Sequence, residues 1–383
     1  MAPGYVHVEV ETAQSAKQTD GPCGDVAACD RSLLATTIVC ADGVGSGIRA
    51  RIAAEMCASR LLESLRIGFS LRRAFEGVVY TMEQFRDPSR PFAAFTVARV
   101  RPDGAATVLA YEAPEAILVS RRHAAAVVSR PLQLQGAMAQ EANCVLEPGD
   151  SLIITSDGIT QAGLGQGLAE GWRTEGVVRF VNDCLADGLT PKDIPHHIHH
   201  QARRLWKTAG DDCTAILAHC RRGQILNILT GPPANAADDA RVVRRFLQSE
   251  GIKVVCGGST AALVARQLGE RLEVEQDSIS LVAPPRYEIP GIDLVTEGAV
   301  TLNQVYNLLD EDIRNLKEDS GVTELCALLQ VADRVNVVMG RAKNKAAGDV
   351  SFRQRGILTR NRIVPLVAEK LRAAGKLVVV DEV

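Results

Sequence analysis

Four aspartates stand where apolar runs of the sequence meet loops, and carboxylates placed this way can do chemistry if the fold brings them together. Asp25 opens one run, Asp42 and Asp157 each follow a run and precede a glycine, and Asp211 comes just before the run CTAILAHC. Carboxylates a few ångströms apart raise one another's pKa unless a cation neutralises them. Hard oxygen ligands favour magnesium or manganese over zinc. The pattern therefore predicts metal-assisted hydrolysis of a phosphate ester.

Each aspartate taken alone has a plainer explanation, because Asp-Gly after a strand is a common turn and Asp often caps a helix. What favours chemistry is that all four acids occupy the same kind of position, at a junction of strand and loop. For the acids to meet, the apolar runs beside them must be strands of one packed unit.

The composition is that of a folded protein long enough for two or three domains. Hydrophobic residues make up 46% and charged residues 23% of the 383 positions, which argues against disorder. A net charge of −3 gives no reason to expect binding to nucleic acid or to a membrane. No apolar stretch reaches the roughly 18 residues that span a bilayer, and the first residues lack a secretory signal, so we expect a cytoplasmic protein.

Residues 1–222 are expected to form a first domain of antiparallel strands with two long helices inserted. The stretch 6–13 alternates like a strand, and apolar residues recur at helical spacing over 48–67 and 71–85. Short apolar runs then follow at close intervals between turns, as in hairpins and meanders. A helical region is predicted over 172–207, and the strand CTAILAHC closes the domain.

Residues 223–383 follow a different pattern, in which short apolar runs alternate with amphipathic helical stretches. Such alternation predicts an α/β domain with a mainly parallel sheet and helices on its faces. The change falls at the turn Arg221-Arg222-Gly223, without a low-complexity linker. The sequence therefore predicts two domains that are joined tightly.

The order of the acidic motifs resembles that of a known family. The motifs are GD at 24–25, ADGVGSG at 41–47, PFAAFTVARV at 91–100, LEPGDSLIITSDGIT at 146–160 and GDDCTAIL at 210–217. In this order they resemble the metal-dependent serine/threonine protein phosphatases of the type 2C fold. The bacterial branch typified by the sporulation stage II protein E phosphatase domain is the closer match, and the resemblance covers about residues 5–220.

This resemblance implies an α/β/β/α sandwich of two antiparallel sheets flanked by helices, with two Mn²⁺ or Mg²⁺ ions between the sheets. It implies that Asp42 bridges the two metals and that the Gly43 carbonyl is a further ligand. It also implies that Asp25 and Asp157 each complete the shell of one metal. Asp42 and Asp157 are thus the residues on which catalysis is expected to depend most.

The same resemblance places Asp211 at the position of the last acidic ligand and Asp212 just outside the ligand shell. Eukaryotic relatives carry a phosphate-binding arginine shortly before the first acid, whereas this chain has Lys17 further upstream. The expected substrate is phosphoserine or phosphothreonine on a small bacterial regulatory protein. The resemblance also implies that the two helices after Asp42 can act as a switch and as the surface of a homodimer.

Two further groups of residues have metal-binding or redox alternatives. A histidine cluster lies in one helical stretch, where residues three or four apart share a face, and consists of His196, His197, His199 and His200. A solvated or partly packed face is favoured over a metal site, because no Glu follows in H-E-x-x-H form. The ten cysteines contain no C-x-x-C pair and several lie in apolar runs, as buried thiols do. Cys23 and Cys213 each lie two residues from a proposed ligand, so oxidative inhibition of the site is the alternative for these two.

The second domain contains a glycine-rich turn between a strand and a helix, made of Gly257, Gly258, Ser259 and Thr260. Backbone N–H groups in such a turn can bind an anion, but a plain tight turn is favoured because no full phosphate-binding motif is present. Residues 341–362 are either a solvated loop or a cradle for an anionic ligand. They hold one acid, Asp349, against seven bases: Arg341, Lys343, Lys345, Arg353, Arg355, Arg360 and Arg362.

The sequence as a whole predicts a metal-dependent phosphoprotein phosphatase followed by a sensor or docking domain. Two alternatives remain open. One is a non-catalytic signalling scaffold with a vestigial metal site. The other is a small-molecule phosphatase, because the basic run near the C-terminus could bind an anionic metabolite.

Overall fold

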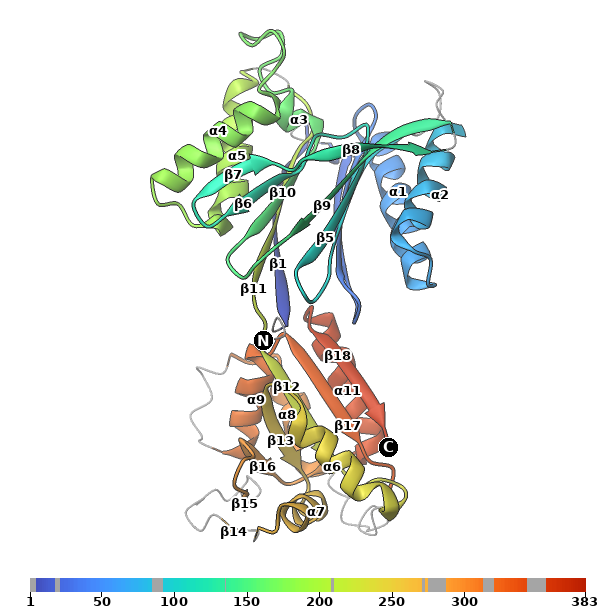
Figure 1. The fold of residues 1–383 in the computed structure, drawn as a ribbon, viewed down its shortest axis with the longest axis vertical. Helices are drawn as coiled ribbons and strands as arrows, with labels where there is room; N and C mark the ends of the chain where they lie inside the picture. The colour runs from blue at the N-terminus through green and yellow to red at the C-terminus, as the bar shows by residue number, and fades with distance from the viewer. Residues whose placement is uncertain are drawn as a thin grey trace. The chain divides into compact units, whose positions relative to one another are not determined.

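The computed structural model of the chain describes residues 5–17, 21–84, 92–134, 136–207, 210–270, 273–274, 287–312, 320–342 and 356–383. The chain divides into two compact units, Met1–Arg222 and Gly223–Val383 (Figure 1). Each unit has its own sheets and its own hydrophobic core.

Two antiparallel sheets face each other in the N-terminal unit. In the described residues, one has the strand order β1-β11-β10-β6-β7 and the other β2-β3-β4-β5-β9-β8. The first consists of β1 (Val6–Ser15), β11 (Cys213–Arg222), β10 (Ser151–Thr155), β6 (Ile117–Ser120) and β7 (His123–Ala126). The second consists of β2 (Asp25–Arg31), β3 (Thr36–Gly43), β4 (Ala93–Val100), β5 (Ala105–Tyr111), β9 (Ala137–Val145) and β8 (Ser129–Leu134).

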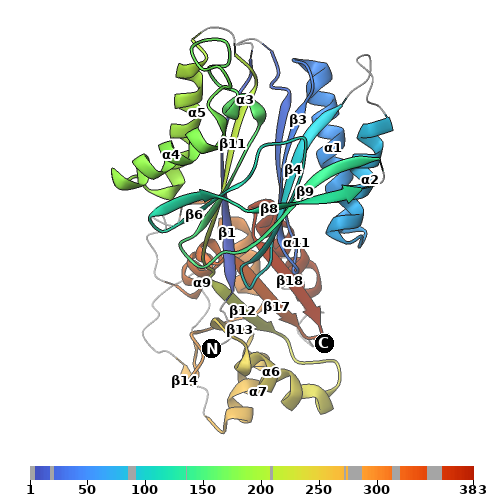
Figure 2. The ribbon, with the colours of Figure 1, turned by 45° about the horizontal axis from the view of Figure 1, so that its top comes forward.

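Helices cover the outer face of each sheet, so the layers are α/β/β/α, as Figure 2 shows. The β2–β8 sheet is covered by α1 (Ile48–Arg66) and α2 (Leu71–Gln84). The β1–β7 sheet is covered by α4 (Arg173–Ala186) and α5 (Ile194–Leu205), with the short α3 (Asp157–Thr160) and the 3₁₀ turn Pro191–Asp193 nearby. The predicted fold class of this domain is confirmed.

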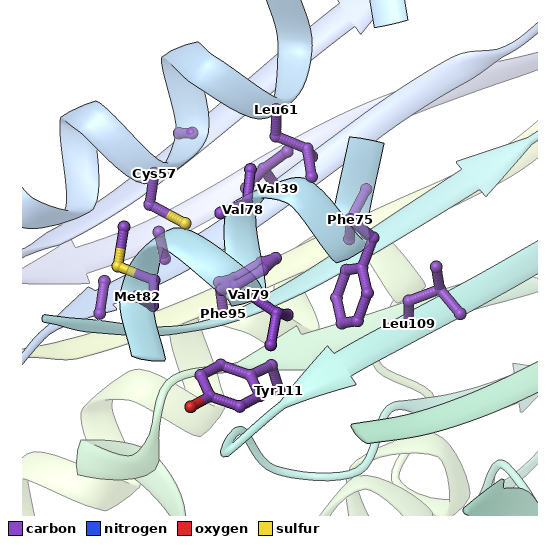
Figure 3. Close-up of a cluster of buried hydrophobic side chains, with 14 of the residues drawn as sticks. Val39, Cys57, Leu61, Phe75, Val78, Val79, Met82, Phe95, Leu109 and Tyr111 are labelled. Carbon is purple, nitrogen blue, oxygen red and sulfur yellow. The ribbon is translucent and has the colours of Figure 1, made fainter. Parts of the chain in front are cut away.

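One face of α1 and one of α2 are apolar at helical spacing, which explains why they pack on a sheet. Ala50, Ala54, Cys57 and Leu61 of α1 are buried. Figure 3 shows the core that α1 and α2 form with the sheet. Its labelled side chains are Val39, Cys57, Leu61, Phe75, Val78, Val79, Met82, Phe95, Leu109 and Tyr111.

Strand alternation decides which side chains face the space between the two sheets. In β3, Val39 and Ala41 pack toward the helices, whereas Ile38 and Cys40 belong to the core between the sheets. Because side chains alternate with period two, Asp42 points to the same side as Cys40. The acid is therefore placed at one end of the space between the sheets.

The C-terminal unit has a sheet with the strand order β14-β15-β16-β13-β12-β17-β18 among its described residues. The run β16-β13-β12-β17-β18 is parallel, and β15 and β14 extend it antiparallel, so the predicted mainly parallel sheet is confirmed. The strands are β12 (Ile225–Thr230), β13 (Ile252–Cys256), β14 (Glu273–Val274), β15 (Tyr287–Glu288), β16 (Leu294–Thr296), β17 (Arg334–Met339) and β18 (Leu377–Glu382).

Helices lie on both faces of this sheet. One hydrophobic core contains α8 (Ala299–Leu308), α9 (Gly321–Val331) and α11 (Arg360–Ala373). A second core, on the other face, contains α6 (Asp239–Gln248), which follows the 3₁₀ turn Ala236–Asp238, and α7 (Gly258–Leu268). None of the helices in the described ranges is long and apolar enough to cross a membrane.

The structure differs from the expectations in two local details. The strands β8 and β9 were not anticipated, because β9 is rich in Ala, Gln, Glu and Asn, which favour strands weakly. The expected helical region 172–207 is broken after Ala186, where Gly188 has φ = 84° and ends α4. Neither difference moves an acidic motif.

Candidate metal centre

The pairing of β2 with β3 brings the first two acids together. Asp25 is the first residue of β2 and lies directly opposite Asp42 in the antiparallel register. The Asp25 side chain is fully buried, with 0% exposure. Opposed like charges at one strand pair destabilise a sheet unless they are neutralised.

The other sheet contributes the remaining acids at the same end of the sandwich. Asp157 is the first residue of α3, directly after β10, and Asp211 and Asp212 precede β11. A hydrogen bond joins the two sheets here, because the Thr214 hydroxyl of β11 donates to Asp25 Oδ2 at 2.6 Å. All four acids found from the sequence are thus gathered at one end of the space between the sheets.

Two glycines allow this close approach. A Cβ at Gly43 would lie 1.9 Å from the backbone carbonyl oxygen of Ala50 in α1, so any side chain there would displace the helix. A Cβ at Gly24 would lie 2.7 Å from Asp212 Oδ2. The glycine beside each acid therefore has a packing reason, in addition to the metal-ligand role expected for the Gly43 carbonyl.

The electrostatics of Asp42 reflect crowding by other carboxylates. Burial, and then the negative charges of Asp25 and Asp157, raise the pKa of Asp42 to about 10. The charge of Asp211 acts in the same direction. Without a cation, Asp42 is therefore protonated at neutral pH.

Asp25 is held by neighbouring polar side chains. Burial raises the pKa of Asp25 to about 6, against hydrogen bonds from Thr214 and Ser156 that lower it. Gln14 Nε2 donates to Thr214 Oγ1 at 2.9 Å and to the Asp25 backbone carbonyl at 3.2 Å. Asp25 Oδ1, in contrast, is buried and has no hydrogen-bond partner among the described residues. One oxygen of Asp25 is fixed by the protein, and the other is buried without a hydrogen-bond partner among the described residues.

Sequence reasoning missed these three supporting residues. Thr214 lies two positions after Asp212, so strand alternation alone places the two on one side and could have drawn attention to the hydroxyl. No comparable signal exists for Gln14 or Ser156, because their contacts depend on the pairing of distant strands.

Lys17 is the cation next to the last acidic motif. Its ammonium group lies 3.6 Å from Asp211 Oδ1, and its backbone N–H donates to Asp212 Oδ1 at 2.7 Å. Burial raises the pKa of Asp211, and Lys17 acts against that rise. Asp212 is itself buried and ties down the segment that follows β1.

The chemistry of this donor set fits divalent cations. The site offers carboxylate oxygens from both sheets, one of them buried without a partner, and an excess of negative charge. In the described residues, no group of three or more His, Cys, Asp or Glu side chains is placed so that it could hold a metal ion as it stands. The donors therefore fit Mg²⁺ or Mn²⁺ in type and charge, while the ligand assignment stays a prediction.

The histidine cluster lies on α5. His196, His197 and His200 are exposed, and His197 Nδ1 is 3.0 Å from the Asp193 carbonyl oxygen. His199 is half-buried, its Nε2 lies 2.8 Å from the Ser15 hydroxyl, and burial lowers its pKa. These contacts agree with the partly packed helix face that the sequence favoured. All ten cysteines belong to the described residues and are free thiols.

The glycine-rich turn of the C-terminal unit lies at the end of β13. The Thr260 side chain is fully buried, and its hydroxyl accepts a hydrogen bond from the Gly231 N–H at 2.8 Å. Gly257 donates to the Thr296 carbonyl at 2.8 Å. Thr260 thus ties two strand ends together, and anion binding by Gly257, Gly258 and Ser259 stays a prediction.

The basic run near the C-terminus is only partly described. Arg341 pairs with Glu382 at 2.5 Å, and Arg360 Nη2 donates to the Ala342 carbonyl at 2.8 Å. Five of its charged residues lie outside the described ranges: Lys343, Lys345, Asp349, Arg353 and Arg355.

Residues 35–221 match the family model of stage II sporulation protein E. Asp42, Asp157 and Asp211 fall inside the match, whereas Asp25 precedes it. The match ends at the last residues of β11 and does not extend into the C-terminal unit. No curated protein is significantly similar to the chain.

Several solved structures are similar to part of the chain at low identity. One contains the PP2C phosphatase domain and part of the regulatory domain of SpoIIE from Bacillus subtilis: 17% identity, TM-score 0.49, covering 57% of this chain and 63% of that one, less than two thirds of its length. Another contains RsbU and RsbW domains from Mycobacterium tuberculosis: 18% identity, TM-score 0.44, 64% and 68% coverage. A third is RsbX in complex with magnesium: 16% identity, TM-score 0.40, 56% and 99% coverage.

Proposed function

We propose, from the premise that residues 35–221 form a SpoIIE-type PP2C phosphatase domain, that this chain hydrolyses phosphoserine or phosphothreonine on a regulatory protein. The reaction would depend on Mn²⁺ or Mg²⁺, with two ions held between the sheets. The observation that carries the proposal is the gathering of acids from both sheets around Asp42, whose pKa is raised by burial and by the charges of Asp25 and Asp157.

The proposed roles follow from where each acid lies. Asp42 and the Gly43 carbonyl would hold the ions from the β2–β8 sheet. Asp25 offers Oδ1, its oxygen without a partner, while Thr214 fixes Oδ2. Asp157 and Asp211 would hold them from the opposite sheet. Asp212 acts from outside the shell by anchoring the backbone of Lys17.

Bound divalent cations would supply a water of lowered pKa and would neutralise charge on the phosphoryl oxygens. The chain's own part is to gather and orient the carboxylates at one end of the sandwich. Lys17, whose side chain is 38% exposed beside Asp211, is a described cation at this end that would attract a phosphate group. We therefore assign phosphate attraction to Lys17 in place of the arginine of eukaryotic relatives.

The test is phosphate release by the full chain after removal of metal and addition of Mn²⁺, with p-nitrophenyl phosphate and a phosphoserine peptide as substrates. Asp42→Asn and Asp157→Asn should each lower kcat/KM more than about 100-fold, since even residues outside a ligand shell commonly account for 10- to 100-fold. Asp103→Asn is the matched control, because Asp103 lies in the β4–β5 turn and pairs with Arg101.

Three outcomes would redirect the proposal. Full activity in both Asp42→Asn and Asp157→Asn would remove the carboxylate mechanism. A wild-type chain that binds Mn²⁺ but hydrolyses neither substrate would be the signalling scaffold. Hydrolysis of p-nitrophenyl phosphate and small metabolites, without hydrolysis of any phosphopeptide, would indicate the small-molecule phosphatase.

We also propose that the outer face of α1 contacts a protein partner, with a second copy of this chain as the first choice. Ile48, Ile52 and Met56 lie four positions apart on α1 and are 62%, 48% and 53% exposed. Light scattering of the full chain should show a dimer that Ile52→Glu converts to a monomer. A monomeric wild type would leave this face to the phosphoprotein substrate.

A further inference from the structure

The N-terminal unit contains a pocket on the β2–β8 sheet, beside the first residue of α2. The pocket has a volume of about 890 Å³. Pockets that hold small-molecule ligands run from roughly 300 to 1,000 Å³. All the residues that line it belong to the N-terminal unit and to the described part of the chain. The pocket is therefore large enough for a whole small ligand and is built by one unit alone.

Strand alternation places Arg99 of β4 on the floor of this pocket. In β4, Val97 packs with α1 and α2, whereas Ala98 belongs to the core between the sheets. Arg99 therefore faces the same side as Val97. Its antiparallel partner in β5 is Thr107, which in turn lies opposite Asn143 of β9. These three lining residues form one polar row across the sheet.

Apolar side chains surround that row. Leu71 is the first residue of α2, and Leu33 and Leu34 lie in the loop between β2 and β3. Leu33 and Leu34 are 49% and 70% exposed, and Val145, which also lines the pocket, is 65% exposed. Exposed apolar residues that gather in one place beside polar groups mark binding sites.

Arg99 has no partner in the described part of the chain. It is half-buried, and its guanidinium makes no ion pair or hydrogen bond with the described residues. Its polar neighbours do not offer it one, because the Thr107 hydroxyl donates to Asn143 Oδ1 at 2.9 Å and the two satisfy each other. A cation that is partly removed from water without a partner lowers stability, and an anion in the pocket would remove this loss.

The acids around Arg99 are each paired with a different arginine. Asp30 shares its row through Thr37, and Glu141 lies two positions before Asn143 on β9. A third acid lines the pocket itself. The pairs, with N–O distances of 2.7 to 3.3 Å, are Arg66–Asp30, Arg72–Glu141, Arg130–Glu141 and Arg101–Asp103. Among the described residues, Arg99 is thus the cation of this pocket that stays unpaired.

We infer that this pocket binds an organic carboxylate with an apolar chain, its acidic group on Arg99 and its chain against Leu34 and Leu71. The planar guanidinium offers parallel N–H donors, which match a carboxylate bidentately. The apolar wall would cover the chain of such a ligand, so that each part of the pocket has its counterpart.

The site is separate from the acids of the candidate metal centre. Arg99 pairs in register with Thr37 of β3, which lies five positions before Asp42. At 3.3–3.4 Å per residue, this is about 17 Å along the strand. The inference therefore does not depend on phosphatase activity, and it gives the N-terminal unit a second ligand site.

The test is calorimetric titration of the full chain with decanoate after removal of metal, so that no bound cation competes for the carboxylate. Acetate is the control for the charge without the chain, and 1-decanol is the control for the chain without the charge. We expect saturable binding of decanoate, and binding of each control at least about 10-fold weaker. Arg99→Gln should weaken decanoate binding by about 10-fold or more, as for other hydrogen bonds to a charged group.

Further variants keep the result decisive. Arg99→Lys keeps the charge and should bind decanoate more tightly than Arg99→Gln. Leu34→Ser changes an exposed side chain, so it tests the pocket even if Arg99→Gln does not fold, and it should weaken binding by about 3-fold or more. Arg122→Gln is the control variant, since Arg122 is exposed between β6 and β7 and does not line the pocket.

Three results would overturn the inference. The first is equal affinity for decanoate in wild type, Arg99→Gln and Leu34→Ser. The second is the absence of saturation by decanoate up to about 1 mM. The third is equal binding of 1-decanol and decanoate, which would show that the leucines form an apolar surface in which Arg99 has no part.

Discussion

The N-terminal unit holds carboxylates in two opposite electrostatic surroundings, one crowded with other acids and one paired with cations. At one end of the sandwich, Asp25 and Asp42 face each other, and Asp157 and Asp211 add their charges, which raise the pKa of Asp42. On the helix-covered side of β1, a single acid, Glu9, lies between two cations. Lys192 and Arg221 lie 2.6 Å and 2.5 Å from Glu9 oxygens.

The two sets differ in the direction of their pKa shifts. Burial alone would raise the pKa of Glu9, but hydrogen bonds and charges from Lys192 and Arg221 lower it to about 2. A paired acid stabilises the folded state when it is ionised, whereas crowded acids without cations destabilise it. Crowded acids therefore lower the stability of the folded protein, and a bound cation removes this loss of stability. A lowered pKa, as at Glu9, is typical of a structural ion pair, whereas a raised pKa among crowded acids, as at Asp42, is typical of residues that bind a cation.

The largest expected effect is at Asp42 in the metal-free protein. Its folded pKa of about 10 lies above the ordinary value of 3.8, so its contribution to stability is complete below about pH 4 and is lost as the pH rises toward 10. Asp42→Asn removes the cost of keeping this side chain protonated above its ordinary pKa and should stabilise the metal-free N-terminal unit by about 2 kcal/mol or more near pH 8. Thermal unfolding followed across this pH range in EDTA measures the effect.

When manganese is added, wild type should become more stable than Asp42→Asn. Wild type should gain thermal stability from Mn²⁺, because ligands that bind only the folded state stabilise it. Asp42→Asn should gain little, and Asp103→Asn should behave like wild type in both conditions. A metal-free Asp42→Asn protein less stable than wild type near pH 8 would mean that the carboxylates are not crowded.

The second effect concerns the hydroxyl that holds Asp25. Thr214→Val keeps the shape of a buried side chain but removes the donor to Asp25 Oδ2. We expect the affinity for Mn²⁺ to fall by 10- to 100-fold, as for other residues that orient metal ligands. Calorimetric titration with Mn²⁺ measures this directly, without any need for turnover.

Thr214→Ser separates the hydroxyl from the packing of the methyl group. It should recover most of the affinity for Mn²⁺, even if the smaller side chain lowers the unfolding temperature. Equal affinity for Mn²⁺ in Thr214→Val and wild type would show that the hydrogen bond from Thr214 does not orient Asp25 for metal binding.

The third effect is at the ion pair around Glu9. Arg221→Met leaves Glu9, whose side chain is 21% exposed, with Lys192 alone. We expect a loss of about 1–2 kcal/mol at neutral pH, between the values typical of exposed and buried pairs. Because the lowered pKa of Glu9 stabilises the fold above about pH 4.5 and this is lost as the pH falls toward 2, the variant should also unfold at higher pH in an acid titration.

Lys192→Met is the matched control for that variant. Lys192 contacts the same acid, but its side chain is 53% exposed against 33% for Arg221. Its substitution should therefore cost less. If the two substitutions cost the same, exposure would not be what sets the strength of this pairing.

The sequence predicted the acids better than it predicted their supports. Asp-Gly after an apolar run is a local sequence motif, so the motif and the family order together predict Asp42 and Asp157. The contact of Thr214 with Asp25 depends on strands from two different sheets, and no local pattern specifies it. The same limit applies to Gln14, whose amide reaches β11 from β1.

The fold was predictable where apolar spacing is strong and was missed where it is weak. α1 and α2 have a clear helical period, and the parallel strands of the C-terminal unit are rich in Val, Ile and Leu. Strand β9, AMAQEANCV, has neither property, and it becomes a strand because it pairs with β5 and β8. Asn227 is the reverse case, since a polar residue inside the apolar run ILNILT is a visible signal of the buried hydrogen bonds that it makes with Glu250 and Asn336.

The smallest expected effect is at an ion pair on the surface of the same unit. Arg66 of α1 donates to Asp30 of β2 at 2.7 Å, and the Arg66 side chain is 56% exposed. Water and salt screen such a pair, so Arg66→Met should change the free energy of unfolding by about 0.5 kcal/mol or less. Chemical unfolding at low and at high salt measures the change, with the Glu9 variants as reference. An Arg66→Met cost that matches Arg221→Met and persists at high salt would mean that the exposure of the arginine, 56% at Arg66 against 33% at Arg221, does not set the strength of these ion pairs.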